Sequence, residues 1–298
     1  MSTCVTVPVA TVWTSPEAPR ELDSSALAEP PDMHAWTAAL GGEQRRGLHG
    51  RTLTQALLGE PVKVLEAAGD WVQVRLPWQP HGPDGAGYTG WVRRSHVGED
   101  GSAPTADVLA VSVLSAPCVP EHGDPVVLSY GTVLGSLGFD TGSAVLALPD
   151  GRPARIRTED VRSPTGEVGG DELLASAREF VGLPYLWGGT SGWGVDCSGL
   201  VHLVHRVHGM TVPRDASDQH EQAQAWSSPQ EAMRGGLFFF ARAGERAYHV
   251  GLVTNSEPLA MLHAPESGPG DGGLVEDAPV APDRIETLVG AGTFLPPP

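Results

Sequence analysis

A change in hydrophobic period near residue 165 most constrains what this chain can fold into. Before it, short apolar runs alternate with polar residues, as in WVQV at 71–74, and glycine turns separate these runs. Alternation with a period of two is typical of half-buried β-strands. After the linker at 163–170, apolar residues recur at helical spacing. The sequence therefore predicts a β-rich N-terminal part and a C-terminal part that contains helices.

A faint internal repeat divides the β-rich part. The segment LLGEPVKVLEAAGDWVQVRL at 57–76 is echoed by SYGTVLGSLGFDTGSAVLAL at 129–148, and a glycine turn and one further strand-like run follow each copy. A repeated pattern indicates a repeated structural unit. We predict two related β-barrels, at 1–103 and 104–165, with one or two short helices inserted into the first near 24–46.

The C-terminal part, at 170–298, combines helices with strands. Gly170 or Asp171 can cap a first helix, and a second helix is expected to begin near Cys197. Apolar runs predict strands at 237–240, 250–254 and 260–262. Two helices followed by strands indicate an α+β domain.

Composition and charge exclude several classes of protein. With 40% apolar and 18% charged residues, the chain can form a packed core. A formal net charge of -17 would be repelled by nucleic acid or by an anionic membrane surface. The chain has no long apolar stretch and its N-terminus lacks the basic region of an export signal. We therefore expect a cytoplasmic protein with no nucleic-acid partner and no membrane partner.

The cysteines indicate neither a disulfide framework nor a metal site. There are three, an odd number, and their spacing is neither paired nor typical of metal ligands. We expect no metal and no cofactor, and the sequence gives no indication of oligomeric state. The three residues are Cys4, Cys118 and Cys197.

One of these cysteines stands where chemistry is expected. Cys197 lies at the predicted start of a helix, where unpaired backbone amides and the helix dipole favour a thiolate. His249 could accept the thiol proton, and His263 could hold that imidazole in the useful tautomer. Each residue alone also fits a structural role, as a buried thiol or a core histidine.

The joint pattern around these residues resembles the NlpC/P60 family of cell-wall cysteine peptidases. GLPYLWGGTSGWGVDCSGLV at 182–201 is followed by PRDASDQ, YHVGLV and MLHAP, in the order and approximate spacing of the family. The resemblance implies a papain-like domain in which Cys197 is the nucleophile, His249 the general base and His263 the residue that orients it. The residues that it implies in the substrate pocket are Tyr185, Asp196 and Ser198.

The N-terminal barrels resemble bacterial SH3-like domains, above all in GYTGWV at 87–92. Together with the peptidase domain they resemble γ-D-glutamyl-L-diamino-acid endopeptidases, in which the first barrel closes the far end of the active site. This implies a murein peptide substrate, L-Ala-γ-D-Glu-diamino acid with a free N-terminal amine, and a role in cell-wall peptide recycling. Tyr88 and Glu60 are the candidates for the ammonium pocket, although Glu60 equally fits a solvated turn.

Three alternatives remain open. The chain could be a secreted peptidoglycan hydrolase (an autolysin), an inactive wall-peptide-binding protein, or a papain-like enzyme with another substrate. Gly235-Gly236-Leu237 replaces the Gly-Asp-Leu common in the family, which favours an inactive domain. The complete Cys197, His249 and His263 set disfavours it, and the negative charge disfavours an autolysin.

Overall fold

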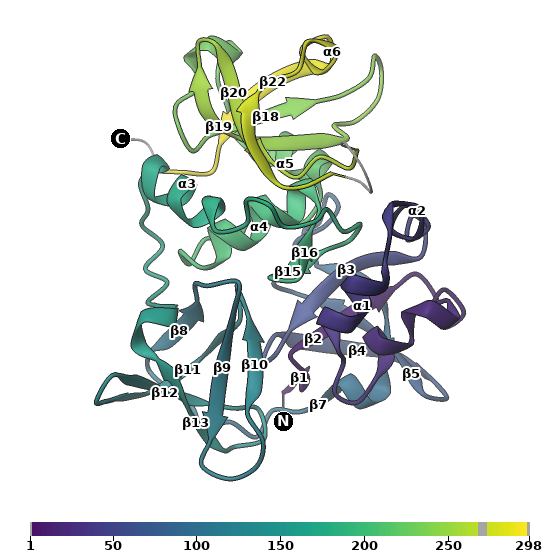
Figure 1. The fold of residues 1–298 in the computed structure, drawn as a ribbon, viewed down its shortest axis with the longest axis vertical. Helices are drawn as coiled ribbons and strands as arrows, with labels where there is room; N and C mark the ends of the chain where they lie inside the picture. Colours follow the sequence, from purple (N-terminus) through teal and green to yellow (C-terminus); the bar gives the residue numbers. More distant parts are fainter. Residues whose placement is uncertain (1, 268–272, 297–298) are drawn as a thin grey trace.

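The computed structural model describes residues 2–267 and 273–296, and its strands form two seven-stranded sheets, one six-stranded sheet and a two-stranded hairpin. In Figure 1 the six-stranded sheet lies at the top, helices α3 (Gly170–Arg178) and α4 (Cys197–Arg206) lie beneath it, and the two seven-stranded sheets lie side by side at the bottom. The units expected from the sequence also include residues 1, 268–272 and 297–298, which lie outside the described residues.

The first seven-stranded sheet is antiparallel, with the order β3-β2-β6-β5-β4-β1-β7. The alternation seen in the sequence at 71–76 buries Val72, Val74 and Leu76 on one face. The strands are β1 Thr3–Val5, β2 Val9–Trp13, β3 Thr52–Leu57, β4 Pro61–Ala68, β5 Trp71–Leu76, β6 Tyr88–Arg93 and β7 Val97–Glu99, with a 3-10 turn at Arg94–His96.

A helical insertion separates β2 from β3. It contains the 3-10 helix η1 Glu21–Leu27 and the helices α1 Met33–Ala39 and α2 Gly42–Arg46. The Trp36 indole is buried and donates a hydrogen bond of 2.9 Å to the buried carboxylate of Asp23. This bond ties α1 to η1, and the Trp36 ring contacts Trp13 of β2, with ring centroids 6.3 Å apart.

The second seven-stranded sheet repeats the first strand for strand, with the order β10-β9-β13-β12-β11-β8-β14. The common order is the structural counterpart of the repeat between 57–76 and 129–148. Its strands are β8 Val108–Val111, β9 Ser115–Pro120, β10 Val126–Ser129, β11 Val133–Asp140, β12 Ser143–Ala147, β13 Pro153–Arg157 and β14 Val161–Arg162, with a 3-10 turn at Thr158–Asp160.

The prediction of two β-barrels is wrong in one respect, because both seven-stranded sheets are open. Among the described residues, β3 pairs only with β2, and β7 pairs only with β1. Closing a barrel requires a hydrogen-bonded ladder between the first and last strands. The final strands β7 and β14 have three and two residues and are too short to supply one after pairing with β1 and β8.

The C-terminal part mixes helices with an antiparallel sheet of order β17-β22-β18-β19-β20-β21, which confirms the predicted α+β class. The helices are α3 Gly170–Arg178, α4 Cys197–Arg206, α5 Ala216–Gln222 and α6 Pro282–Ile285. The strands are β17 Gln224–Ala225, β18 Leu237–Phe240, β19 His249–Ser256, β20 Leu259–His263, β21 Glu276–Pro279 and β22 Leu288–Thr293, with a hairpin of β15 Thr190–Ser191 and β16 Gly194–Val195 and a 3-10 turn at Pro229–Glu231.

Helix α4 lies at the centre of the molecule. It runs between the six-stranded sheet and the two N-terminal units (Figure 1), and all ten of its residues are buried. Leu200 and Val204 pack in one core with Phe239 and Val250 of the sheet. A helix covered on every side is held in a fixed position, so its first residue, Cys197, is held there too.

Candidate active site

The start of α4 is shaped by three neighbouring residues. Asp196 caps the helix, and its side chain accepts a hydrogen bond of 2.7 Å from the amide of Gly199. A Cβ on Gly199 would lie 2.2 Å from the carbonyl oxygen of Gly189, so only glycine fits there. The Asp-Cys-Ser-Gly order therefore places Cys197 in the first turn of α4, where the neighbouring backbone is packed tightly.

A cleft of about 320 Å³ lies over Cys197, between the first SH3-like unit and the C-terminal part. Its lining includes the predicted site residues Tyr88, Tyr185, Asp196, Cys197 and Ser198, together with Asp215 and Trp187. A larger cavity of about 680 Å³ lies between the two N-terminal units, and its lining contains none of the predicted site residues. The smaller cleft is the candidate active site because Cys197, the predicted nucleophile, lines it.

The Cys197 thiol is protonated in this environment. Burial raises the pKa of the thiol to about 12, and the Asp196 carboxylate acts in the same direction, against the Val250 amide and the Arg214 guanidinium. Desolvation therefore outweighs the stabilisation of the thiolate that was expected from the N-terminus of the helix. The thiol therefore needs a base to become a nucleophile.

The two predicted histidines lie next to each other. His249 begins β19, and its Nε2 atom lies 2.8 Å from Nδ1 of His263 on β20. A glycine makes this approach possible, because a Cβ on Gly251 would lie 3.1 Å from the Cβ of His263. On its other side His263 Nε2 lies 3.3 Å from Oε1 of Glu276 on β21.

Both imidazoles are held neutral. Burial lowers the pKa of His249 well below its ordinary value, and Arg284 and His263 lower it further. Burial and Arg284 lower the pKa of His263 to about 3. A neutral His249 can accept a proton, which is what the thiol requires.

Asp196 is part of a buried charge network. Its carboxylate pairs bidentately with the buried guanidinium of Arg214, at 2.9 and 2.6 Å. Arg214 also donates to Ser198 Oγ at 3.1 Å and to Thr54 Oγ1 at 2.9 Å. Thr54 belongs to β3, so this network fixes the first turn of α4 against the first SH3-like unit.

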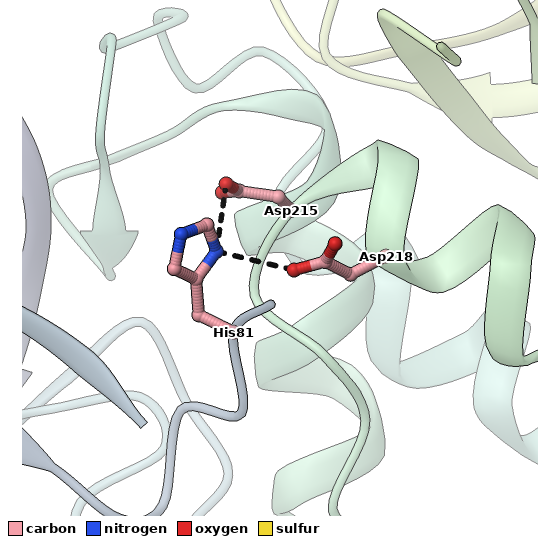
Figure 2. A group of neighbouring side chains, drawn as sticks. All are labelled: His81, Asp215 and Asp218. Atoms are coloured by element: carbon pink, nitrogen blue, oxygen red, sulfur yellow. Dashed lines mark ion pairs between the residues drawn. The ribbon is translucent and has the colours of Figure 1, made fainter. Parts of the chain in front are cut away.

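A second charged cluster, formed by His81, Asp215 and Asp218 (Figure 2), adjoins the cleft through Asp215, which lines it. The Tyr88 hydroxyl donates to Asp215 Oδ2 at 3.0 Å, and the Tyr88 ring stacks on His81 with centroids 4.2 Å apart. His81 Nδ1 lies 3.3 Å from Asp215 Oδ2 and 3.1 Å from Asp218 Oδ2. His81 comes from the loop before β6, whereas both aspartates lie at the start of α5.

These groups also form a potential cation site. The ligand atoms of His81, Asp215 and Asp218 all lie within 4.8 Å of one another. The hydrogen bond to Asp215 raises the pKa of His81, against burial, and so favours the imidazolium. Burial raises the pKa of Asp215, but His81 and Arg214 outweigh it and the carboxyl is held below its usual range. The His81 imidazolium and the Asp215 carboxylate can therefore form an ion pair within this cluster.

Glu60 lies elsewhere and does not line the cleft. Its carboxylate is 1% exposed and pairs with Arg206 Nη1 at 2.8 Å and with Gln79 Nε2 at 2.8 Å. Arg206 is on α4, so Glu60 fixes the helix to the first unit. A buried ion pair gives it no access to a substrate ammonium group, and neither the substrate role nor the solvated turn considered from the sequence describes it.

The departure at Gly236 has a local cause. A Cβ at this position would lie 2.3 Å from the Trp226 ring. The indole thus occupies the space where the aspartate common in the family would project. Gly236 lies directly before β18 and does not line the Cys197 cleft.

A buried cysteine at the start of a helix and a histidine pair on adjacent strands are the arrangement that the sequence motifs predicted. The NlpC/P60 family model matches residues 182–270, and the model of the bacterial dipeptidyl-peptidase SH3 domain matches residues 45–97. The chain belongs to the NlpC/P60 family of cysteine peptidases.

Particular relatives match nearly the full length. A γ-D-glutamyl-L-lysine dipeptidyl-peptidase of Bacillus cereus is 32% identical, over 98% of this chain and 90% of that protein. The protein of the same name from Bacillus subtilis is 32% identical, over 87% and 88%. The crystal structure of an NlpC/P60 family protein from Bacillus cereus superimposes with a TM-score of 0.90 at 30% identity, covering 99% of this chain and 100% of that one.

Three residues of the site were missed by sequence reasoning: His81, Asp215 and Glu276. Asp215 lies within the PRDASDQ stretch, so the motif itself was a signal. Glu276 faces His263 only through the register of β20 and β21, and His81 reaches α5 only through docking of the first unit. No signal in the sequence alone joins those pairs.

Proposed function

We propose that the protein is a cysteine endopeptidase that hydrolyses the γ-D-glutamyl-diamino-acid bond of murein peptides with a free N-terminal L-Ala. The observation that carries this proposal is the placement of Cys197 and Asp215 in one cleft of about 320 Å³. A nucleophile and a carboxylate in one confined space suit a short peptide with a reacting carbonyl and a terminal ammonium group.

The residues assigned to the ammonium pocket are Tyr88 and Asp215. Tyr88 is on β6 of the first SH3-like unit, and its hydroxyl is bonded to the Asp215 carboxylate at 3.0 Å. That bond leaves further lone pairs on the carboxylate for an ammonium group. An acylated amine would bring no charge and would add bulk where the first unit closes the cleft, so a free amine is preferred.

The proposed reaction is acyl transfer. His249 takes the Cys197 proton, and the thiolate attacks the γ-carbonyl carbon of D-Glu to give a tetrahedral oxyanion. The Cys197 amide at the start of α4 donates to that oxyanion. The oxyanion collapses, the C–N bond breaks, and the His249 imidazolium protonates the departing amine. Water, deprotonated by His249, then releases L-Ala-γ-D-Glu and restores the thiol.

The remaining assignments follow the same geometry. His263 orients His249, and Tyr185, Asp196 and Ser198 shape the substrate side of the cleft. Asp196 and Ser198 act through the Arg214 network, because their side chains are already bonded to it.

A free-amine peptide is a product of wall breakdown, so the proposed role is recycling, in the cytoplasm. Relatives are named for L-lysine at the cut, and we propose a diamino acid there. Among the described residues, no helix is both long and apolar enough to cross a membrane.

Digestion followed by mass spectrometry tests the proposal. The substrates are L-Ala-γ-D-Glu-L-Lys, L-Ala-γ-D-Glu-diaminopimelate and the N-acetylated form of each, with wild type and Cys197→Ala. We expect L-Ala-γ-D-Glu only from free-amine peptides and only with wild type. Equal cleavage of acetylated peptides would support a wall hydrolase, and cleavage of neither would support a binding protein.

A further inference from the structure

We propose that Glu276 is a positioning residue, which acts through His263 to fix the tautomer of His249 and to stabilise its protonated form. Glu276 is the first residue of β21 and stands directly opposite His263 in the antiparallel register. Its Oε1 atom lies 3.3 Å from Nε2 of His263. This inference concerns the cysteine–histidine chemistry and rests on the proposed function only for its peptidase assay.

The direction of each hydrogen bond follows from the chemistry of the carboxylate. An ionised carboxylate can only accept, so His263 Nε2 carries a hydrogen and donates it to Glu276. A neutral imidazole has one hydrogen, so His263 Nδ1 accepts. The partner of that atom is His249 Nε2, 2.8 Å away, which must therefore donate. Nδ1 of His249 is then the ring nitrogen left to take the Cys197 proton.

The charge of Glu276 matters as well as its lone pairs. When His249 accepts the thiol proton it becomes an imidazolium in a buried site, next to the neutral His263. Arg284 on α6 is a cation whose field opposes that step. Glu276 is hydrogen-bonded to His263 on the side of the ring away from His249, and its negative charge opposes the field of Arg284. Its side chain is 53% exposed, so solvent screens part of the effect.

The next residue offers a matched control. Asp277 follows Glu276 on β21, and successive side chains of a strand point to opposite faces. Asp277 pairs with Arg178 of α3 at 3.1 Å instead of with a histidine. Asp277→Asn therefore removes the same charge from the same strand without touching the histidine pair.

The test measures two properties in Glu276→Gln, Glu276→Ala, Asp277→Asn and wild type. One is kcat and KM for L-Ala-γ-D-Glu-L-Lys between pH 5 and 9. The other is the rate at which iodoacetamide alkylates Cys197, followed by mass spectrometry of the Cys197 peptide. Alkylation needs no substrate, so it decides the inference even if the proposed peptide is not cleaved. Thermal melting shows whether each variant is folded.

In Glu276→Gln we expect kcat and the alkylation rate at pH 7 each to fall about fivefold, the scale of a partly exposed charged hydrogen bond. KM should not change. The acid limb of kcat/KM should move to lower pH, because the His249 imidazolium has lost a negative neighbour. Glu276→Ala should show a larger loss than Glu276→Gln, since it removes the acceptor as well.

The inference is overturned if both Glu276 variants match Asp277→Asn in kcat, alkylation rate and acid limb. It is also overturned if Glu276→Gln changes only KM or only the melting temperature, because a structural role would do that. Should Glu276→Ala fail to fold, the nearly isosteric Glu276→Gln decides by itself.

Discussion

At the scale of single residues, burial sets the chemistry of the site. Desolvation raises the pKa of the Cys197 thiol to about 12 and lowers that of His249. Each shift disfavours the charged form of its group. The resting groups are therefore a thiol and a neutral imidazole, and the proposed mechanism requires the proton to move from Cys197 to His249 before attack.

The Asp215 carboxylate is the group proposed to bind the ammonium group of the substrate. In Asp215→Asn we expect KM for the free-amine tripeptide to rise roughly tenfold to a hundredfold, the scale of one hydrogen bond to a charged group. The rate at which iodoacetamide alkylates Cys197 should not change, since alkylation needs no substrate. Steady-state kinetics on the free-amine peptide and alkylation measure both properties, with exposed Asp84→Asn as control. A KM equal to that of wild type would show that Asp215 does not recognise the amine.

At the scale of elements, glycines decide how closely the chain can pass itself. Gly199 permits the first turn of α4 to meet Gly189, and Gly251 permits β19 to approach His263. Neither glycine has a left-handed backbone, so space, and not conformation, is the constraint. These close approaches explain why the DCSG and HVG patterns contain glycine where they do.

Space is also the constraint at Gly236. We expect Gly236→Asp to lower the free energy of unfolding by about 1–3 kcal/mol, because the new side chain collides with the Trp226 ring. The double variant Gly236→Asp with Trp226→Ala should recover much of the loss beyond the cost of Trp226→Ala alone. Urea denaturation of the four proteins of this cycle measures the coupling. Additive losses would mean that Trp226 is not the obstacle.

At the scale of the whole molecule, the first SH3-like unit completes the cleft over Cys197. It supplies Tyr88 to the lining, its His81 contacts Tyr88 and Asp215, and it fixes α4 through Thr54 and Glu60. The unit is thus joined to the catalytic part by buried polar contacts as well as by packing. Removing one partner of such a contact is costly because it leaves the other buried and unpaired.

Substitution of Glu60 tests how much its ion pair with Arg206 stabilises the contact between the first unit and α4. We expect Glu60→Gln to lower the free energy of unfolding by about 3 kcal/mol, since Arg206 keeps a buried, unpaired charge. The preference for free-amine over acetylated peptide should not change, because Glu60 does not line the cleft. Urea denaturation and the two-peptide assay check both statements, with exposed Glu66→Gln as control. A lost preference with normal stability would place Glu60 in the pocket.

Two buried histidines, His205 on α4 and His208 just after its end, predict acid sensitivity. Burial lowers the pKa of His205 and of His208 to about 4. In the unfolded chain a histidine binds its proton near pH ~6.5. The unfolded state therefore binds more protons between these values, and stability present above pH ~6.5 is lost as pH falls through about 4. The urea midpoint should fall from pH 7 to pH 5.

Substitution of His205 alone measures its contribution to the loss of stability at low pH. His205→Gln should reduce the loss of stability between pH 7 and pH 5, because one buried titratable group is gone, whereas exposed His34→Gln should not. An unchanged dependence in His205→Gln would assign the acid sensitivity to other groups.

The sequence by itself determined the local features of this protein. Strand alternation, the change of period, the repeat and the glycine-bearing motifs all depend on neighbours along the chain, and they located the α+β class, Cys197, His249 and His263. Only the tertiary structure decided that the sheets are open, that Glu60 is a buried ion pair, and that His81 and Glu276 reach the site. The physical reason is that register and docking bring together residues distant in sequence, and burial then sets their charge.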